Sequence, residues 1–261
     1  MTLHTTTYGD EGSPIVFCHG LFGQGRNWTA VAKALADEHR TVLVDLPHHG
    51  RSPWSESFDY VEVADQLAAL LADLFGEDDP VTLVGHSMGG KAAMVTALRS
   101  PELVDRLRVV DIAPVDYGGS GEFASYVEAM EGLDLGSLQR RADADEALRS
   151  SVPNRTVREF LLQNLRHEGD SWRWQVNLEV LGRDLDALSG WPADRLDGVA
   201  PFGGPVLWLA GGDSDYVRGG QDAEMRRLFP RVRKVVVKGA GHWVHAQRPE
   251  VVVEALRQLT A

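Results

Sequence analysis

Short, uninterrupted runs of apolar residues limit the possible folds of this sequence more than any other feature. Each run is bounded by Gly, Pro or Asp, and segments with apolar residues at helical spacing lie between the runs. Consecutive Val, Leu and Ile are typical of strands in a parallel sheet that helices cover on both faces. Strands are expected at Pro14–Cys18, Arg40–Leu46, Pro80–Gly85, Arg106–Ile112, Pro205–Ala210 and Lys234–Lys238. Helices are expected at Trp28–Asp37, Val61–Phe75, Met88–Arg99 and Pro249–Leu259. The sequence therefore predicts the α/β class, with a mostly parallel twisted sheet and helices on both of its faces.

Residues 115–200 interrupt this alternation. The segment contains no convincing strand, and short helices are expected at Gly121–Glu131, Asp143–Ser150, Thr156–Arg166 and Val176–Asp186. Because an insertion of this length exceeds a plain crossover between strands, we expect a helical cap over the carboxyl edge of the sheet, where such sheets bind ligands. An elaborate surface excursion is the alternative. The predicted organisation is a core of residues 1–114 and 201–261 and a cap, or lid, of residues 115–200.

Charge and cysteine content exclude several classes of protein. With 38 acidic and 26 basic side chains the formal net charge is −12, which disfavours nucleic acid and anionic membrane surfaces as partners. The single cysteine, Cys18, cannot form an internal disulfide, and neither a secretory signal nor an apolar run of membrane-spanning length is visible. We therefore expect a cytoplasmic protein that is a monomer or a small homo-oligomer. The sequence has no HExxH motif and no Cys cluster, so no metal is expected.

The motif Gly85-His86-Ser87-Met88-Gly89 carries the clearest chemical signal. It matches G-x-S-x-G, and it follows a predicted strand and precedes a predicted helix, which is the context that the motif requires. In such a nucleophile elbow the serine lies on a strained turn, and the flanking glycines avoid collisions with neighbouring chain segments. A glycine-rich turn that binds phosphate or merely packs is the alternative. Neither the G-x-G-x-x-G pattern nor the P-loop spacing supports phosphate binding.

Four motifs occur together in this chain: His19-Gly20-Leu21-Phe22-Gly23, the segment Gly85–Lys91, Val110-Asp111-Ile112-Ala113-Pro114-Val115 and Gly239-Ala240-Gly241-His242-Trp243-Val244-His245. In these motifs the chain resembles the α/β-hydrolase superfamily, and within it the small YbfF-type esterases. The resemblance covers nearly the whole chain, and the Asp-Ile-Ala-Pro-Val stretch is its most discriminating part. It implies a serine hydrolase in which Asp111 supports the catalytic histidine and Ser214 assists.

A serine nucleophile needs a base and an orienting acid. His242 is the best-placed of nine histidines, because it follows the last strand and precedes the closing helix. The residues alone do not decide which aspartate is the orienting acid. Relatives usually carry it after the strand that corresponds to Pro205–Ala210, where the expected slot is occupied by Ser214 and flanked by Asp213 and Asp215. The alternative is Asp111, at the end of the strand that follows the nucleophile's strand.

The remaining site residues are predicted from their places in loops. Two backbone amides are expected to form the oxyanion hole, one from Met88 and the other from Leu21, with Phe22 as the alternative. Aromatic side chains in loops or in the predicted cap are candidates for an apolar substrate pocket. They are Phe22, Trp54, Tyr117, Trp174, Tyr216 and Trp243.

These residues together predict a serine carboxylesterase that hydrolyses small uncharged esters with short to medium acyl chains and needs no cofactor. Other reactions of the same triad are thioester hydrolysis, lactone opening, carbon–carbon bond hydrolysis and perhydrolysis. A non-catalytic small-ligand receptor with the same fold is an alternative of a different class.

Overall fold

The computed structural model of the chain describes residues 2–119 and 121–257. Their centre is a seven-stranded sheet with the strand order β1-β3-β2-β4-β5-β8-β9. The strands are β1 (Thr5–Tyr8), β2 (Pro14–Cys18), β3 (Arg40–Val44), β4 (Val81–His86), β5 (Val104–Val110), β8 (Val206–Gly211) and β9 (Val232–Val237). All neighbouring strands run parallel except β1, which pairs with β3 in the antiparallel direction. The predicted α/β class and the six predicted strands are confirmed, and β1 was not predicted.

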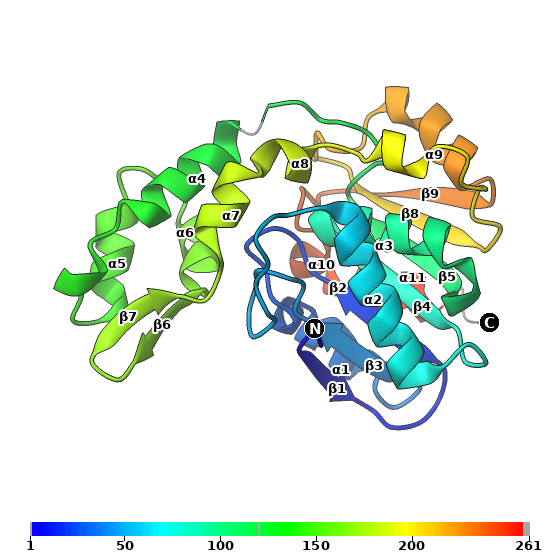
Figure 1. Cartoon of the computed structure of the whole chain (residues 1–261), viewed down its shortest axis with the longest axis horizontal. Helices are drawn as coiled ribbons and strands as arrows, with labels where there is room; N and C mark the ends of the chain where they lie inside the picture. The colour runs from blue at the N-terminus through cyan, green and yellow to red at the C-terminus, as the bar shows by residue number, and fades with distance from the viewer. Residues whose placement is uncertain (1, 120, 258–261) are drawn as a thin grey trace.

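Helices cover both faces of this sheet (Figure 1). One face packs against α2 (Tyr60–Phe75), α3 (Met88–Arg99) and α9 (Asp222–Leu228), which contribute to the larger apolar core. The other face packs against α1 (Thr29–Leu35), α10 (Val244–Gln247) and α11 (Pro249–Arg257). The last residues of the predicted helix Pro249–Leu259 lie outside the described part of the chain. In the described part, no helix is both long enough and apolar enough to cross a membrane.

Short 3-10 helices occupy several connections between these elements. They are η1 (Gly25–Trp28), η2 (Pro101–Leu103), η3 (Leu135–Ser137), η4 (Ala193–Leu196) and η5 (Gly219–Gln221). The first of them, η1, directly precedes α1. In the predicted helix Trp28–Asp37, Trp28 is therefore the last residue of a 3-10 helix, and the α-helix begins at Thr29.

Most elements of segment 115–200 lie at one end of the molecule, and α8 (Leu185–Ser189) leads back toward the sheet (Figure 1). The other α-helices and strands of this segment are α4 (Gly121–Glu131), α5 (Arg141–Leu148), α6 (Arg155–Leu162), β6 (Leu165–Glu168), β7 (Ser171–Trp174) and α7 (Leu178–Arg183). The expectation of a strand-free segment is wrong, because β6 and β7 form an antiparallel hairpin. The helix predicted to reach Arg166 ends at Leu162, and Gly169 supplies the left-handed conformation of the hairpin turn (φ = 59°).

Buried side chains of this segment belong to the same apolar core as the sheet. Val127 and Met130 of α4, Val157 of α6 and Leu181 of α7 cluster with residues of β2, β4 and β5. The Tyr60 hydroxyl on α2 donates a hydrogen bond of 2.8 Å to the Leu188 carbonyl on α8. The segment is therefore packed and hydrogen-bonded against the rest of the described chain.

Candidate active site

Ser87 lies on the sharp turn between β4 and α3 that the sequence predicts. Its backbone is left-handed (φ = 52°), which is rare and strained for a residue with a side chain. A Cβ atom on Gly85 would overlap the Gly89 carbonyl, and one on Gly89 would overlap the His19 carbonyl. The glycines are therefore needed for the chain to turn this tightly. The turn is anchored by the Ser87 N–H, which donates to the Val110 carbonyl at 3.1 Å.

Asp111 follows β5 and is fully buried, also with a left-handed backbone (φ = 51°). Its Oδ2 atom accepts a hydrogen bond from His242 Nδ1 at 2.8 Å, and its Oδ1 atom accepts one from the Gly211 N–H at 2.8 Å. The Ser214 hydroxyl donates to the same Oδ2 atom. The carboxylate thus orients the imidazole and is itself held by a hydroxyl and a backbone amide.

The two other candidate acids do not reach the histidine. Asp213 and Asp215 are both exposed, and the Asp215 carboxylate pairs with Arg218 at 2.8 Å. Of the three aspartates that the sequence leaves open, the structure brings only Asp111 to His242.

Aromatic and imidazole rings surround His242. Tyr216 stacks on it with a ring-centroid distance of 4.0 Å, and His86 lies at 4.7 Å on a tilted plane. His86 Nε2 donates to the His242 carbonyl at 2.9 Å, which ties the histidine's own backbone to the nucleophile elbow. Burial lowers the pKa of His86 well below its usual value and the pKa of His245 to about 3, so both imidazoles are neutral near pH 7. The sequence offers no signal for this support by His86.

The loop after β2 presents a backbone amide beside the nucleophile. The Phe22 N–H donates to His49 Nε2 at 3.1 Å, so it already has an acceptor. No protein acceptor for the Leu21 or Met88 N–H is found among the described residues. These two amides are therefore free to meet a ligand oxygen, which favours Leu21 over Phe22.

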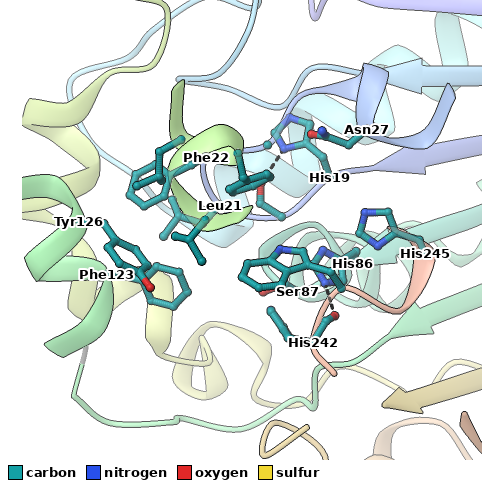
Figure 2. A pocket seen from close by; sticks show the side chains of 16 residues that line it. His19, Leu21, Phe22, Asn27, His86, Ser87, Phe123, Tyr126, His242 and His245 are labelled. Carbon is teal, nitrogen blue, oxygen red and sulfur yellow. Dashed lines mark hydrogen bonds between the residues drawn. The ribbon is translucent and has the colours of Figure 1, made fainter. Parts of the chain in front are cut away.

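Two cavities open on Ser87, with volumes of about 30 Å³ and 70 Å³. The first also touches His242 and Trp243, and Figure 2 shows Ser87 and His242 at one end of it and Phe123 at the other. The second extends past Met88 between α3 and α8. Leu21, Ser87 and Phe123 line both cavities, so they meet at the nucleophile.

Four of the six aromatic side chains predicted for a substrate pocket line these cavities. Phe22 and Trp243 belong to the first cavity, and Tyr117 and Tyr216 to the second. The prediction that Trp174 lines a substrate pocket is wrong, because its side chain faces the interior of segment 115–200. There its indole N–H donates to the Met130 carbonyl at 3.0 Å. Trp54 is 46% exposed and lines neither cavity.

The second cavity also contains a buried lysine that the sequence analysis did not single out for the site. Lys91 lies one turn after Ser87 on α3, and its ammonium donates to the Ser189 and Gly190 carbonyls, each at 2.5 Å. It lies 4.9 Å from the centroid of the Tyr117 ring. Burial lowers the pKa of Lys91 to about 7. The lysine therefore joins the nucleophile's helix to the end of α8, which forms a wall of this cavity.

A parallel sheet with a strained serine elbow and a buried Asp–His pair defines a hydrolase of the α/β class. Residues 15–255 match the alpha/beta hydrolase family, and the chain belongs to that family. It is 39% identical to the mouse sn-1-specific diacylglycerol lipase ABHD11 over 97% of this chain and 83% of that protein. It is 33% identical to esterase YbfF of Escherichia coli over 95% of this chain and 93% of that protein.

The chain is also similar to an esterase of known structure. The chain matches a marine microorganism esterase with a TM-score of 0.92 and 30% identity, over 98% of both chains. These likenesses confirm the expected resemblance and the expected class of enzyme, a carboxylic ester hydrolase.

Proposed function

We propose that this enzyme is a serine carboxylesterase that acts on small uncharged esters with short to medium acyl chains. One observation carries the proposal. The Asp111 carboxylate holds Nδ1 of His242 at 2.8 Å, and the same imidazole lines a cavity with the elbow serine, Ser87. A histidine that donates from Nδ1 to a carboxylate presents Nε2 as the base.

In this mechanism, His242 Nε2 takes the proton of the Ser87 hydroxyl as its oxygen attacks the ester carbonyl. The N–H groups of Leu21 and Met88 donate to the oxyanion that forms. The tetrahedral intermediate collapses, the alkoxide leaves with the proton from His242, and an acyl-enzyme remains. Water then gives a proton to the same imidazole and attacks the acyl carbonyl, and the acid is released with Ser87 restored. Asp111 stabilises the imidazolium in both halves of the reaction.

The two cavities suggest how an ester lies in the site. The leaving alcohol must receive its proton from His242, so we assign the first cavity to the alcohol. The second cavity, beyond Met88, then receives the acyl chain. Among the described residues, no aspartate, glutamate or arginine lines either cavity, and Lys91 already donates to two carbonyls. This lining favours uncharged substrates.

We also propose that residues 115–200 act as the cap. Phe123 and Tyr126 of α4 and Phe160 of α6 contribute to the wall of the first cavity. Leu185 and Leu188 of α8 contribute to the wall of the second. A segment that covers both cavities would exclude water and limit the size of the substrate. The cytoplasmic location, the absence of nucleic-acid partners and the oligomeric state stay predictions.

Hydrolysis of p-nitrophenyl butyrate by wild type and Ser87→Ala tests the proposal. The wild type should turn over, and Ser87→Ala should lose at least about a thousandfold of kcat while keeping the wild-type fold by circular dichroism. A fluorophosphonate should label the wild type at Ser87. Unchanged activity in Ser87→Ala would refute the catalytic serine, and a folded wild type that neither turns over nor labels would favour the receptor alternative.

The substrate class needs a separate panel. It consists of p-nitrophenyl esters of increasing acyl length, an acyl-CoA thioester, a lactone, a carbon–carbon hydrolase substrate and a perhydrolysis assay. A short diacylglycerol belongs in it because the mouse relative is named a diacylglycerol lipase. A clear preference for any of the others over neutral short-chain esters would replace the proposed substrate.

A further inference from the structure

The oxyanion loop is defined here as residues 20–23, between β2 and η1. Its Phe22 has a left-handed backbone (φ = 58°), a conformation that a phenylalanine rarely adopts without external support. The amide proposed to bind the oxyanion belongs to Leu21, one residue earlier. The direction of that amide therefore depends on the groups that hold the loop in this conformation.

Neutral histidines hold the loop from the core side. His19 Nδ1 donates to the Gly20 carbonyl at 2.8 Å, and the Gly23 N–H donates to the same oxygen at 2.9 Å. Because N–H and C=O point in opposite directions within the plane of a trans peptide, fixing the direction of the Gly20 carbonyl also fixes the direction of the Leu21 N–H. His49 accepts the Phe22 N–H and donates from Nδ1 to the Pro47 carbonyl at 2.8 Å.

Segment 115–200 supplies the remaining support. The Phe22 carbonyl accepts hydrogen bonds from Asn164 Nδ2 at 2.7 Å and from Gln163 Nε2 at 3.2 Å. Asn164 is fully buried, and its Oδ1 atom accepts from Gln24 Nε2 at 2.8 Å. One amide group therefore donates to the oxyanion loop and accepts from the residue just after it, which requires both a donor and an acceptor at this position.

We propose that Asn164, a residue of the segment between α6 and β6, positions the oxyanion hole by holding the Phe22 carbonyl. It acts through the loop backbone and does not touch the substrate. Without it, the oxyanion loop can relax from its strained conformation, and the Leu21 N–H turns away from the developing charge. The inference rests on the proposed serine mechanism and adds to it a dependence on segment 115–200.

Asn177 offers a matched control. It also belongs to segment 115–200 and is buried, and it also bonds to a core loop. Its side-chain Nδ2 lies 3.3 Å from His48 Nδ1, and its Oδ1 caps α7 by accepting the Val180 N–H at 3.3 Å. Asn177→Ala therefore removes a comparable buried amide without a direct contact to the oxyanion loop.

The experiment compares wild type, Asn164→Ala and Asn177→Ala on p-nitrophenyl butyrate. In Asn164→Ala, kcat should fall by about 10- to 100-fold while KM stays within about twofold, since only transition-state contacts are weakened. A second readout compares inhibition by a trifluoromethyl ketone, which forms a tetrahedral oxyanion on the serine, with inhibition by the matching methyl ketone. The preference for the trifluoromethyl ketone should fall about as much as kcat in Asn164→Ala and stay at the wild-type value in Asn177→Ala.

Three outcomes separate the proposals. An active wild type with wild-type kcat in folded Asn164→Ala overturns this inference alone, as does an equal loss of kcat in Asn177→Ala. A folded wild type without turnover overturns the proposed function and, with it, this inference. If Asn164→Ala does not fold, Gln24→Met removes the bond that orients the Asn164 amide. An unchanged ketone preference in that variant then overturns the inference, and a reduced preference supports it.

Discussion

Acidification from pH 7 to pH 5.5 should cost the folded enzyme roughly 5 kcal/mol of stability, because four buried histidines stay neutral in the folded chain and become protonated in the unfolded chain. Burial lowers the pKa of His19 to about 4 and the pKa of His245 to about 3. It also lowers the pKa values of His49 and His86 well below 6.5. In the unfolded chain each histidine titrates near pH 6.5.

The direction of the effect follows from proton binding. Below pH 6.5 the unfolded chain binds protons that the folded chain cannot, so stability is present above pH 6.5 and is lost as the pH falls. At pH 5.5 all four sites are still neutral in the folded state, so the result hardly depends on how low each folded pKa lies. Each site contributes about 1.2 kcal/mol between pH 7 and pH 5.5, and the sum for the four sites is comparable to the total stability of a marginally stable domain.

Urea unfolding followed by tryptophan fluorescence at pH 5.5, 6.0, 6.5 and 7.0 measures this loss. His245 stacks on Trp28 at a ring-centroid distance of 4.3 Å, and its buried Nδ1 atom has no hydrogen-bond partner within residues 2–119 and 121–257. His245→Phe should therefore fill the site and reduce the pH slope by about one quarter. Val244→Ala, at the buried neighbour, should lower the free energy of unfolding at every pH and leave the slope unchanged. A wild-type slope of less than one proton per molecule in this range would refute the argument that these imidazoles are neutral.

Two further predictions concern groups at the site. Asp111→Asn should lower kcat about 10³- to 10⁴-fold, because an amide favours the wrong imidazole tautomer. Asp215→Asn should leave kcat at the wild-type value. Steady-state kinetics on p-nitrophenyl butyrate measures both, and a larger loss in Asp215→Asn would assign the acid to the loop after β8. Burial lowers the pKa of Lys91 to about 7, so the folded chain loses this proton above pH 7 while the unfolded chain keeps it up to pH 9. Wild-type stability should therefore rise by about 2 kcal/mol between pH 7 and pH 9. Lys91→Met should remove that rise in urea unfolding, and an equal rise in the variant would assign it to other groups.

Local pattern was enough to predict most of the sheet and the nucleophile. The buried parallel strands are continuous apolar runs, and the Gly85–Gly89 turn has steric demands that its own residues reveal. The edge strand β1 was missed because Thr5, Thr6 and Thr7 are polar and partly exposed. The β6–β7 hairpin was missed because Leu161, Leu162 and Leu165 also fit a helical period.

The partners of the nucleophile depend on strand order, which the sequence does not state. Asp111 and His242 are 131 residues apart. They meet because Asp111 follows β5 and His242 follows β9, and β5, β8 and β9 are parallel neighbours whose carboxyl ends lie at the same edge of the sheet. The support of the oxyanion loop by Asn164 has no sequence signal of its own. A single asparagine after a helix has no periodicity and no motif, and its importance follows only from the carbonyl that it meets.

Ser214 has a practical consequence for redesign of the enzyme. Its hydroxyl donates a hydrogen bond to Asp111 from the loop after β8, so that loop supplies a neutral donor to the proposed acid, which follows β5. The neighbouring residues Asp213 and Asp215 are exposed and have no role in the proposed mechanism. A library could therefore vary these two positions, keep Ser214 and Tyr216, and be screened for altered substrate selectivity while Asp111 still holds His242. An enzyme with its catalytic acid in this loop could not be varied there in the same way.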